Sequence, residues 1–390
     1  MLRIPLHSLA LVSVIGFLPS YCNAQSFMGL GDLPGGTFQS GANAISADGS
    51  VVVGYSYSAS GAEAFRWTTS SGMIGLGDLP GGGFGTYARS VSADGSVIVG
   101  IGTAASGNAE AFRWTTSGGM TSLGDLPGGS VRSYAHGVSG DGSVVVGPGT
   151  SALGYEAYRW TSDGAMVGLG HFPGGDFESE ASAVSADGTV VVGFGDSMSG
   201  TQAFRWTSAE GMVGLGQLGD LSAAFNVSGD GSTVVGYGRT ALGNEAFRWT
   251  STSGIVGLGQ LPGGTNNYAY GVSADGSILV GHGDSDSSPQ EAFIWDSING
   301  MRSLQSVLVT DFGLNLTGWT LSSAHSVSAD GLTIVGGGTN PSGLHEAWIA
   351  HIPEPSALTL LAFVLFATTR RNHFHGRERK APQGLLGLTS

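Results

Sequence analysis

Short apolar runs separated by glycine-rich turns recur along most of the chain. In one stretch, Val97–Gly100 forms a continuous apolar run, which is typical of a strand buried on both faces. Ala88–Ser92 precedes this run, and Glu110–Trp114 and Gly119–Gly124 follow it as further short strands. The intervening turn, Ala93–Ser96, contains Asp-Gly, which favours a two-residue hairpin. The pattern predicts a unit of four short antiparallel strands.

This stretch is one of seven copies. The turn aspartate recurs at Asp48, Asp94, Asp141, Asp187, Asp230, Asp275 and Asp330. Successive aspartates are 46, 47, 46, 43, 45 and 55 residues apart. Four short strands in a unit of this length correspond to one propeller blade, whereas one coil of a parallel β-helix is much shorter. We therefore expect an all-β, seven-bladed β-propeller of four-stranded antiparallel blades, with another β-solenoid as the alternative.

The two ends of the repeat array predict how the ring closes. The third strand of the seventh copy, Trp348–Ala350, has no fourth strand after it. The array begins with a fourth strand that has no blade of its own, Phe27–Gly31. Pairing these two segments would remove an exposed sheet edge, whereas a linear solenoid would carry capping units. We expect the N-terminal strand to complete the last blade.

Residues 1–24 have the pattern of a secretory signal peptide. Arg3 supplies the positive charge, residues 9–18 are mostly apolar, and the small residue Ala24 precedes the expected cleavage point. A membrane anchor is the weaker interpretation, because the apolar run is too short to span a bilayer. The only cysteine of the chain, Cys22, lies in this segment, so we expect a mature protein without disulfides.

The charge of the repeat region argues against nucleic acid as a ligand. Residues 25–352 contain nine arginines and no lysine against 27 acidic residues, which leaves a net charge near −18. Nucleic acids are bound through clustered basic residues, which this region does not offer. The chain also contains 69 glycines without a triplet period, which indicates β structure rich in turns.

The repeated polar motifs have structural interpretations. We interpret the seven aspartates as turn residues. We expect the third-strand arginines to pair with acidic groups between blades rather than form an anion-binding ring; they are Arg66, Arg113, Arg159, Arg205 and Arg248. Asp284–Ser288 resembles the start of a calcium loop, but Pro289 stands where that loop needs glycine. The histidines have no metal-ligand spacing, so we predict no catalytic, cofactor-binding or metal site.

The least repetitive stretch, residues 303–323, lengthens the last repeat to 55 residues. Insertions in propellers often shape one face of the ring, and loops on a rigid scaffold often carry function. We therefore expect any function specific to this chain here, with a plain elongated loop as the alternative.

The repeat resembles the HAF-family extracellular repeats. The resemblance lies in two motifs that recur in register, such as Val91–Ser96 and Glu110–Trp114, and it covers nearly all of residues 25–350. It implies a secreted repeat protein and brings no particular activity.

The C-terminal segment, residues 351–390, resembles the PEP-CTERM sorting signal. A Pro-Glu-Pro motif precedes an apolar stretch at 357–369, which is long enough only for a short helix, and two arginines follow. The residues concerned are Pro353, Glu354, Pro355, Arg370 and Arg371. The family implies transient anchoring in the inner membrane and processing by exosortase, a membrane protease-transpeptidase. Nineteen residues follow the arginines, whereas family members usually end sooner. A permanent single-pass anchor is the alternative.

Together these patterns predict a secreted, non-catalytic propeller at the cell surface or in the exopolysaccharide matrix. It would act as a structural or glycan-binding module. The alternative is a propeller enzyme, a hydrolase or lyase, that acts on extracellular polysaccharide; clustered, non-repeated acidic residues facing one funnel would favour it.

Overall fold

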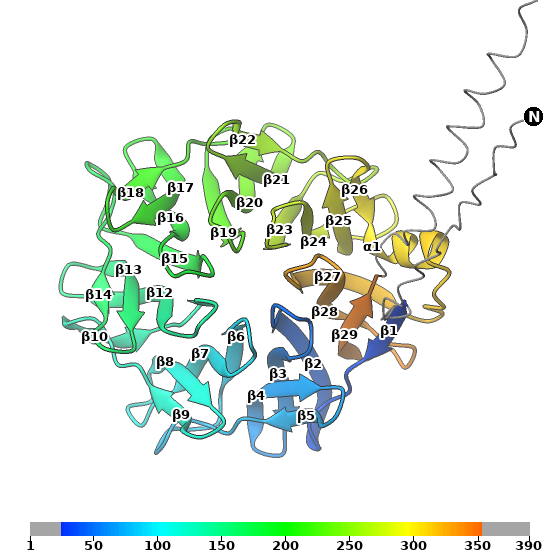
Figure 1. Ribbon diagram of the computed structural model, residues 1–390, viewed down its shortest axis with the longest axis horizontal. Helices are drawn as coiled ribbons and strands as arrows, with labels where there is room; N and C mark the ends of the chain where they lie inside the picture. The colour runs from blue at the N-terminus through cyan, green and yellow to red at the C-terminus, as the bar shows by residue number, and fades with distance from the viewer. Residues whose placement is uncertain (1–24, 353–390) are drawn as a thin grey trace, which may run out of the picture. The chain divides into compact units, whose positions relative to one another are not determined.

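The computed structural model describes residues 25–352, which form seven antiparallel sheets arranged in a ring (Figure 1). Each sheet is one blade, and its strands follow one another from the axis to the rim. The expected all-β, seven-bladed propeller is therefore confirmed. The expected signal peptide with Ala24 and the expected sorting motif from Pro353 onward lie outside the described residues.

The strands occupy equivalent positions in the seven blades. The innermost strands are β2 (Gly35–Ile45), β6 (Tyr87–Val91), β10 (Gly128–Ser133) with β11 (Gly137–Val138), β15 (Ser179–Val184), β19 (Ser222–Val227), β23 (Asn267–Val272) and β27 (Thr320–Val327). The second strands are β3 (Val52–Ser58), β7 (Val97–Thr103), β12 (Val144–Ser151), β16 (Val191–Ser197), β20 (Thr233–Thr240), β24 (Ile278–Gly283) and β28 (Thr333–Thr339).

The outer half of each blade is equally regular. The third strands are β4 (Gly61–Thr68), β8 (Ala109–Thr115), β13 (Tyr155–Thr161), β17 (Gly200–Thr207), β21 (Gly243–Thr250), β25 (Glu291–Asp296) and β29 (His345–His351). The outermost strands are β5 (Gly72–Gly75), β9 (Gly119–Ser122), β14 (Val167–Gly168), β18 (Gly211–Gly214), β22 (Gly254–Gly257), β26 (Gly300–Ser303) and, in the last blade, β1 (Ser26–Gly29).

The N-terminal strand closes the ring, as the ends of the repeat array predict. Strand β1 pairs antiparallel with β29, with Ser26 opposite His351 and Gly29 opposite Trp348. Just beyond β1, the Gly31 N–H donates to Glu346 Oε1 at 2.9 Å. The first, third and fifth blades form the same bond between equivalent residues. The borrowed strand thus makes the contacts of an ordinary fourth strand.

Neighbouring blades pack through apolar residues of their second and third strands. At the first interface, Val53 and Ala64 pack with Leu79, Ile98 and Phe112. Leu79 belongs to the Asp-Leu-Pro-Gly-Gly connection between blades and is buried, as is Phe112. The same positions recur at the following interfaces. Truncating such a buried phenylalanine to alanine costs about 3–5 kcal/mol, so the repeated aromatic positions hold the ring together.

The aspartate turns lie on one face of the ring, which we call the turn face; the blade-to-blade connections lie on the opposite loop face. The turns differ from the expected two-residue hairpin. The Ser92 N–H donates to the Val97 carbonyl at 2.9 Å, which leaves a four-residue loop, Ala93–Ser96. Within the loop the Gly95 N–H donates to the Ser92 carbonyl, and Gly95 has a φ of 71°. The glycine therefore supplies the left-handed residue that this longer loop needs.

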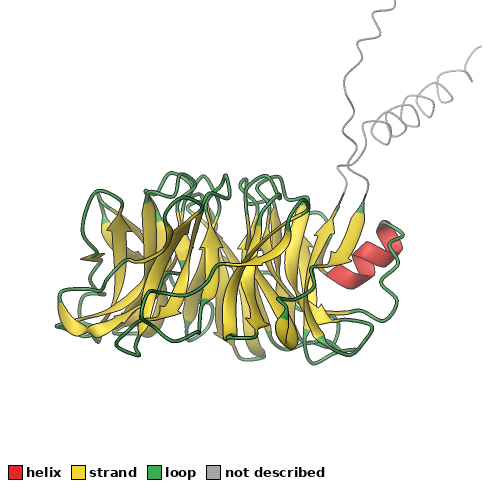
Figure 2. Ribbon diagram, turned by 90° about the horizontal axis from the view of Figure 1, so that it is seen from below, coloured by secondary structure: helices red, strands yellow, loops and turns green. Residues whose placement is uncertain are grey.

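The only helical segments of residues 25–352 lie at the rim of the ring (Figure 2). They are α1 (Leu304–Ser306) and the π-helical turn η1 (Val307–Asp311). Among these described residues no helix has the length and apolar character needed to cross a membrane.

Candidate functional site

The innermost strands place one unpaired residue per blade at the axis. In six blades a β-bulge shifts the register between the first and second strands. In β6, for example, Ala88 lies opposite Gly100 and Ser90 opposite Val99, so Arg89 is the extra residue. Such bulges re-aim a side chain, here toward the axis. Blade three breaks its inner strand instead, between β10 and β11, and places His136 there.

These positions line one cavity of about 600 Å³ on the axis of the ring. Every blade contributes to it, and the side chains at the unpaired positions vary from blade to blade, with only histidine occurring twice: Asn43, Arg89, His136, Ser182, Phe225, Tyr270 and His325. The surrounding strands repeat closely, so the seven residues at the axis are the place where the molecule departs from its internal symmetry. The combination of a concave site with a few convergent polar groups makes this cavity the best candidate site in the described part of the chain.

One side of the cavity is aromatic. The rings of Phe225 and Tyr270 lie almost parallel, with centroids 5.2 Å apart and an interplanar angle of 8°. Tyr237 packs on Phe225 at 5.4 Å, and Tyr268 and His282 extend the cluster around Tyr270. Burial, together with the neighbouring phenols, raises the pKa of Tyr270 to about 12, so this side chain is neutral at physiological pH. The result is an uncharged aromatic wall.

Blades two, three and four contribute Arg89, His136 and Glu180 to the cavity. His136 Nδ1 lies 3.5 Å from Glu180 Oε1. Burial raises the pKa of Glu180 to about 7, with a further contribution from Glu178, while Arg89 opposes the rise. Burial and the charge of Arg89 lower the pKa of His136 to about 4, so its imidazole is neutral at pH 7. Perturbed pKa values of this kind concentrate at functional sites, although structural clusters also produce them.

Two axial side chains also lock neighbouring blades. Asn43 Nδ2 donates to the Ala88 carbonyl at 2.8 Å. His325 Nδ1 lies 2.9 Å from the Ala42 carbonyl, which can only accept, so Nδ1 carries the proton. Burial lowers the pKa of His325, and the neutral ring therefore keeps its lone pair on Nε2. Part of the polar lining is thus fixed by the scaffold.

A ring of backbone hydrogen bonds surrounds the axis at the turn face. Within residues 25–352, six such bonds of 2.9–3.0 Å each join one aspartate turn to the next: Ala47 to Ala93, Ala93 to Gly140, Gly140 to Ala186, Ala186 to Gly229, Ala274 to Ala329 and Ala329 to Ala47. A Cβ added at Gly140 would lie 3.4–3.5 Å from the Cβ atoms of Ala186 and Ala93. The ring is closely packed at this point, and the position before each aspartate holds only alanine or glycine.

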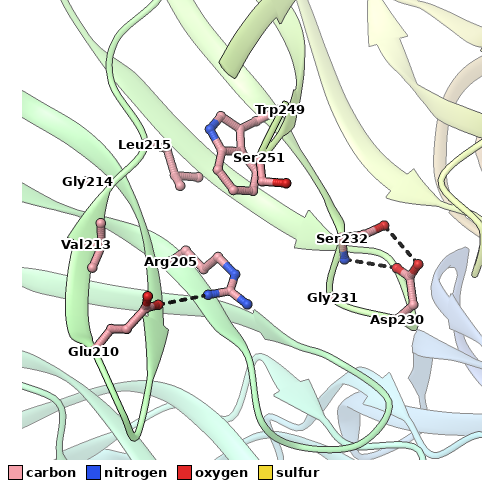
Figure 3. Close-up of a pocket in the computed structure, with 10 residues that line it drawn as sticks. All are labelled: Arg205, Glu210, Val213, Gly214, Leu215, Asp230, Gly231, Ser232, Trp249 and Ser251. Carbon is pink, nitrogen blue, oxygen red and sulfur yellow. Dashed lines mark hydrogen bonds and ion pairs between the residues drawn. The ribbon is translucent and has the colours of Figure 1, made fainter. Parts of the chain in front are cut away.

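A second pocket, of about 510 Å³, lies between blades four and five on the turn face (Figure 3). It is built from repeated residues, including Arg205, Trp249 and the turn Asp230–Ser232. Arg205 pairs with Glu210 of its own blade at 3.4 Å, and Asp230 is bonded to Ser232. At the next interface the equivalent Arg248 reaches the following turn instead, at the Gly276 carbonyl. The pocket is therefore one form of the groove that lies between each pair of neighbouring blades, and its residues are not specific to this interface.

The expected pairing of the third-strand arginines with acidic groups between blades is wrong. Among the described residues, Arg205 pairs with an acid of its own blade, and Arg248 crosses to a backbone carbonyl at 3.3 Å. Arg66 and Arg113 each have a buried Nε atom without a hydrogen-bond partner. The aspartate carboxylates bond within their own turns instead: Asp94 Oδ1 accepts from Ser92 Oγ at 2.7 Å and from the Ser96 N–H at 3.0 Å.

The aspartates themselves are turn residues, as expected. In all seven turns the carboxylate accepts a hydrogen bond from the serine hydroxyl two residues earlier. The bond from Ser92 is the main reason why the pKa of Asp94 falls to about 2.

The acidic loop at Asp284–Ser288 is engaged within the protein. Burial works to raise the pKa of Asp284, but bonds from Asn266 and Thr265 outweigh it and hold the pKa at about 2. Residues 25–352 contain no group of three or more His, Cys, Asp or Glu side chains that could hold a metal ion.

The insertion at residues 303–323 packs against the closing strand. Leu304, Leu308 and Leu316 are buried in one cluster with Trp348, and Trp319 contacts Phe27 edge-on at 5.1 Å. The stretch expected to carry the individual function therefore places its apolar side chains in the core of the last blade. It covers the junction at which the N-terminal strand enters.

Sequence reasoning missed the axial residues. One signal in the sequence could have identified them. The residue three positions before each turn serine varies from repeat to repeat, as Arg89 does before Ser92, whereas the alanine before it and the Val or Ile two positions after it repeat.

No protein-family model matches the sequence, and no curated protein matches it. Solved structures are similar at the level of the fold. The β-propeller domain of the Trilobed protease from Pyrococcus furiosus is 13% identical, with a TM-score of 0.48 and coverage of 68% of this chain and 81% of that one. The WD40 propeller domain of Doa1 is also 13% identical, with a TM-score of 0.48 and coverage of 83% and 97%.

TolB from Acinetobacter baumannii is 12% identical, with a TM-score of 0.46; the match covers 67% of this chain and 62% of that one. At such identities the similarity concerns the fold alone.

Proposed function

We propose that this protein is a non-catalytic, glycan-binding β-propeller whose binding site is the central cavity. The observation that carries the proposal is the set of seven axial side chains, of six residue types, in an otherwise repeated scaffold. The C–H faces of a sugar ring pack well on aromatic rings such as Phe225 and Tyr270, and the polar side chains of the same cavity can bond sugar hydroxyls.

The proposal includes export and sorting. The signal pattern at residues 1–24 and the PEP-CTERM resemblance at residues 353–371 support delivery to the cell surface or the exopolysaccharide matrix after processing by exosortase. The mature protein should begin near Gln25 and end near Pro353–Pro355. Intact-mass analysis of the exported protein tests this, and retention of Ser390 on that protein would overturn the sorting proposal.

Binding is tested with polysaccharide from an exopolysaccharide-producing strain. Phe225→Ala removes half of the stacked aromatic pair and should weaken binding about tenfold, which corresponds to about 1.4 kcal/mol. Phe84→Ala is the matched control, because Phe84 is an exposed aromatic residue, 43% accessible, in a blade-to-blade connection away from the cavity. An equal loss of affinity in both variants, or a loss only in Phe84→Ala, would indicate that the glycan binds at the outer loops rather than in the cavity.

A propeller enzyme acting on polysaccharide is the second candidate. The observation that favours it is Glu180 beside His136 in the same cavity, since a carboxyl group with a pKa of about 7 suits proton transfer near neutral pH. The binding experiment therefore includes a measurement of reducing ends over time. Steady release of reducing ends that Glu180→Gln abolishes would show that the protein is an enzyme rather than a binding module.

A further inference from the structure

Arg89 is the cation of the central cavity. It occupies the bulge of β6, lines the cavity and is exposed within it. Within residues 25–352 its guanidinium forms no ion pair, whereas Arg205 and Arg302 do. The walls of the cavity partly desolvate the Arg89 guanidinium and lower its pKa, and the nearby Tyr55, Tyr87 and Glu180 oppose this shift. A guanidinium group remains protonated in proteins, so a free positive charge faces the cavity.

We infer that the Arg89 side of the cavity binds the carboxylate of an acidic sugar residue. The inference rests on the proposed glycan-binding function and specifies its ligand. A planar guanidinium offers parallel N–H groups that match the two oxygens of a carboxylate. The aromatic wall formed by Phe225 and Tyr270 belongs to the same cavity, so a glycan bound there can place a sugar ring on the wall and a carboxylate at Arg89.

The surroundings favour a single negative charge over a more highly charged group. Glu180 faces the same space as Arg89, and a ligand anion is repelled by it when Glu180 is ionised. The titratable groups that face Glu180 from the neighbouring strands are Arg89, His136, Tyr155, Glu178 and Asp196. A uronate, with one carboxylate per sugar, fits a site with one free guanidinium and one titrating acid.

This arrangement couples ligand binding to proton uptake at Glu180. A bound carboxylate disfavours ionised Glu180 and raises its pKa further above about 7, so binding takes up a proton. Affinity should therefore rise as the pH falls from about 8 to about 6. His136, with a pKa of about 4, stays neutral over this range and contributes no opposing change.

The test compares an oligosaccharide of glucuronic acid with the same oligosaccharide after its carboxyl groups have been reduced to alcohols. Arg89→Gln should weaken binding of the acidic form about tenfold and change binding of the reduced form less than about twofold. Arg205→Gln is the control, because it removes the same charge from the turn-face pocket of Figure 3. Unchanged melting temperatures show that each variant is folded.

The outcomes separate this inference from the proposed function. If the wild-type protein binds the reduced oligosaccharide as tightly as the acidic one, the glycan-binding proposal stands and the role of Arg89 is overturned. If it binds neither, the proposed function itself fails. If free glucuronate binds as tightly as the oligosaccharide, the assignment to a polymer residue is wrong.

Glu180→Gln tests the coupling to pH. The variant has a permanently neutral side chain, so its affinity for the acidic oligosaccharide should not change between about pH 6 and about pH 8. At the higher pH it should match the wild-type protein at the lower pH. If the pH dependence of the affinity is the same in the variant and the wild-type protein, Glu180 is not its cause.

Discussion

The turn aspartates show how a repeated residue stabilises a propeller without taking part in binding. Asp94 Oδ1 accepts from Ser92 Oγ at 2.7 Å and from the Ser96 N–H at 3.0 Å. The Ser92 hydroxyl oxygen in turn accepts from the Val97 N–H at 2.9 Å. The hydroxyl and the carboxylate thus satisfy the backbone of a loop that connects the two innermost strands.

Replacing Asp94 with alanine should lower the free energy of unfolding by about 1–2 kcal/mol, because the alanine accepts neither hydrogen bond. Asp94→Asn is the matched control: its amide oxygen still accepts both bonds, and its loss should stay within about 0.5 kcal/mol. Urea unfolding at neutral pH measures both variants. Equal losses would mean that the charge of Asp94, rather than its two bonds, stabilises the loop.

The same carboxylates predict an acid limit to stability. The pKa of Asp94 and of Asp141 is about 2 in the folded protein, lowered chiefly by the bond from the preceding serine hydroxyl. A lowered pKa contributes stability that is present above the unfolded value of about 4 and is lost as the pH falls toward about 2. Melting temperatures should fall through that window, and less steeply for Asp94→Asn. An identical slope would exclude Asp94 as a source of the acid sensitivity.

At the scale of elements, the closing strand β1 connects the two ends of the described chain. Phe27 faces inward, with Trp319 at 5.1 Å and Trp348 at 6.1 Å, whereas Met28 is 48% exposed. These neighbours on one strand provide a matched pair of variants for closure of the ring.

Phe27→Ala should lower the free energy of unfolding by about 2 kcal/mol, less than for a fully buried phenylalanine because Phe27 is only half-buried. Met28→Ala should change it by less than about 0.5 kcal/mol. Deleting residues 25–33 should lower the melting temperature more than either substitution. An unchanged melting curve after the deletion would show that the ring does not depend on β1.

Element order could be predicted from the sequence, because each strand pattern occurs seven times and the unmatched fourth strand at residues 27–31 identifies its own pairing. The packing of residues 303–323 could not be predicted from the sequence. These residues contact Phe27, almost 300 residues earlier, and no local sequence pattern encodes such a contact. The length of the hairpin loop was missed because Asp-Gly also suits a four-residue loop when a serine hydroxyl caps it.

At the scale of the whole molecule, the repeats build a regular scaffold, and the residues that differ between blades lie at the axis. Arg89 and Phe225 occupy equivalent positions in different blades and face one cavity. Their meeting could not be read from the sequence, because a bulge breaks the simple alternation of a strand and sets which residue points inward. Closure of the ring then brings residues from all seven copies together.

The central claim is that the axial cavity binds an uncleaved acidic glycan, and a crystal structure of the protein with a glucuronic acid oligosaccharide tests it most directly. The account predicts an intact sugar in the cavity, with its ring against Phe225 and Tyr270 and its carboxylate at Arg89. Sugar bound only between Arg205 and Trp249, only on the outer loops, or present only as a cleavage product would contradict it.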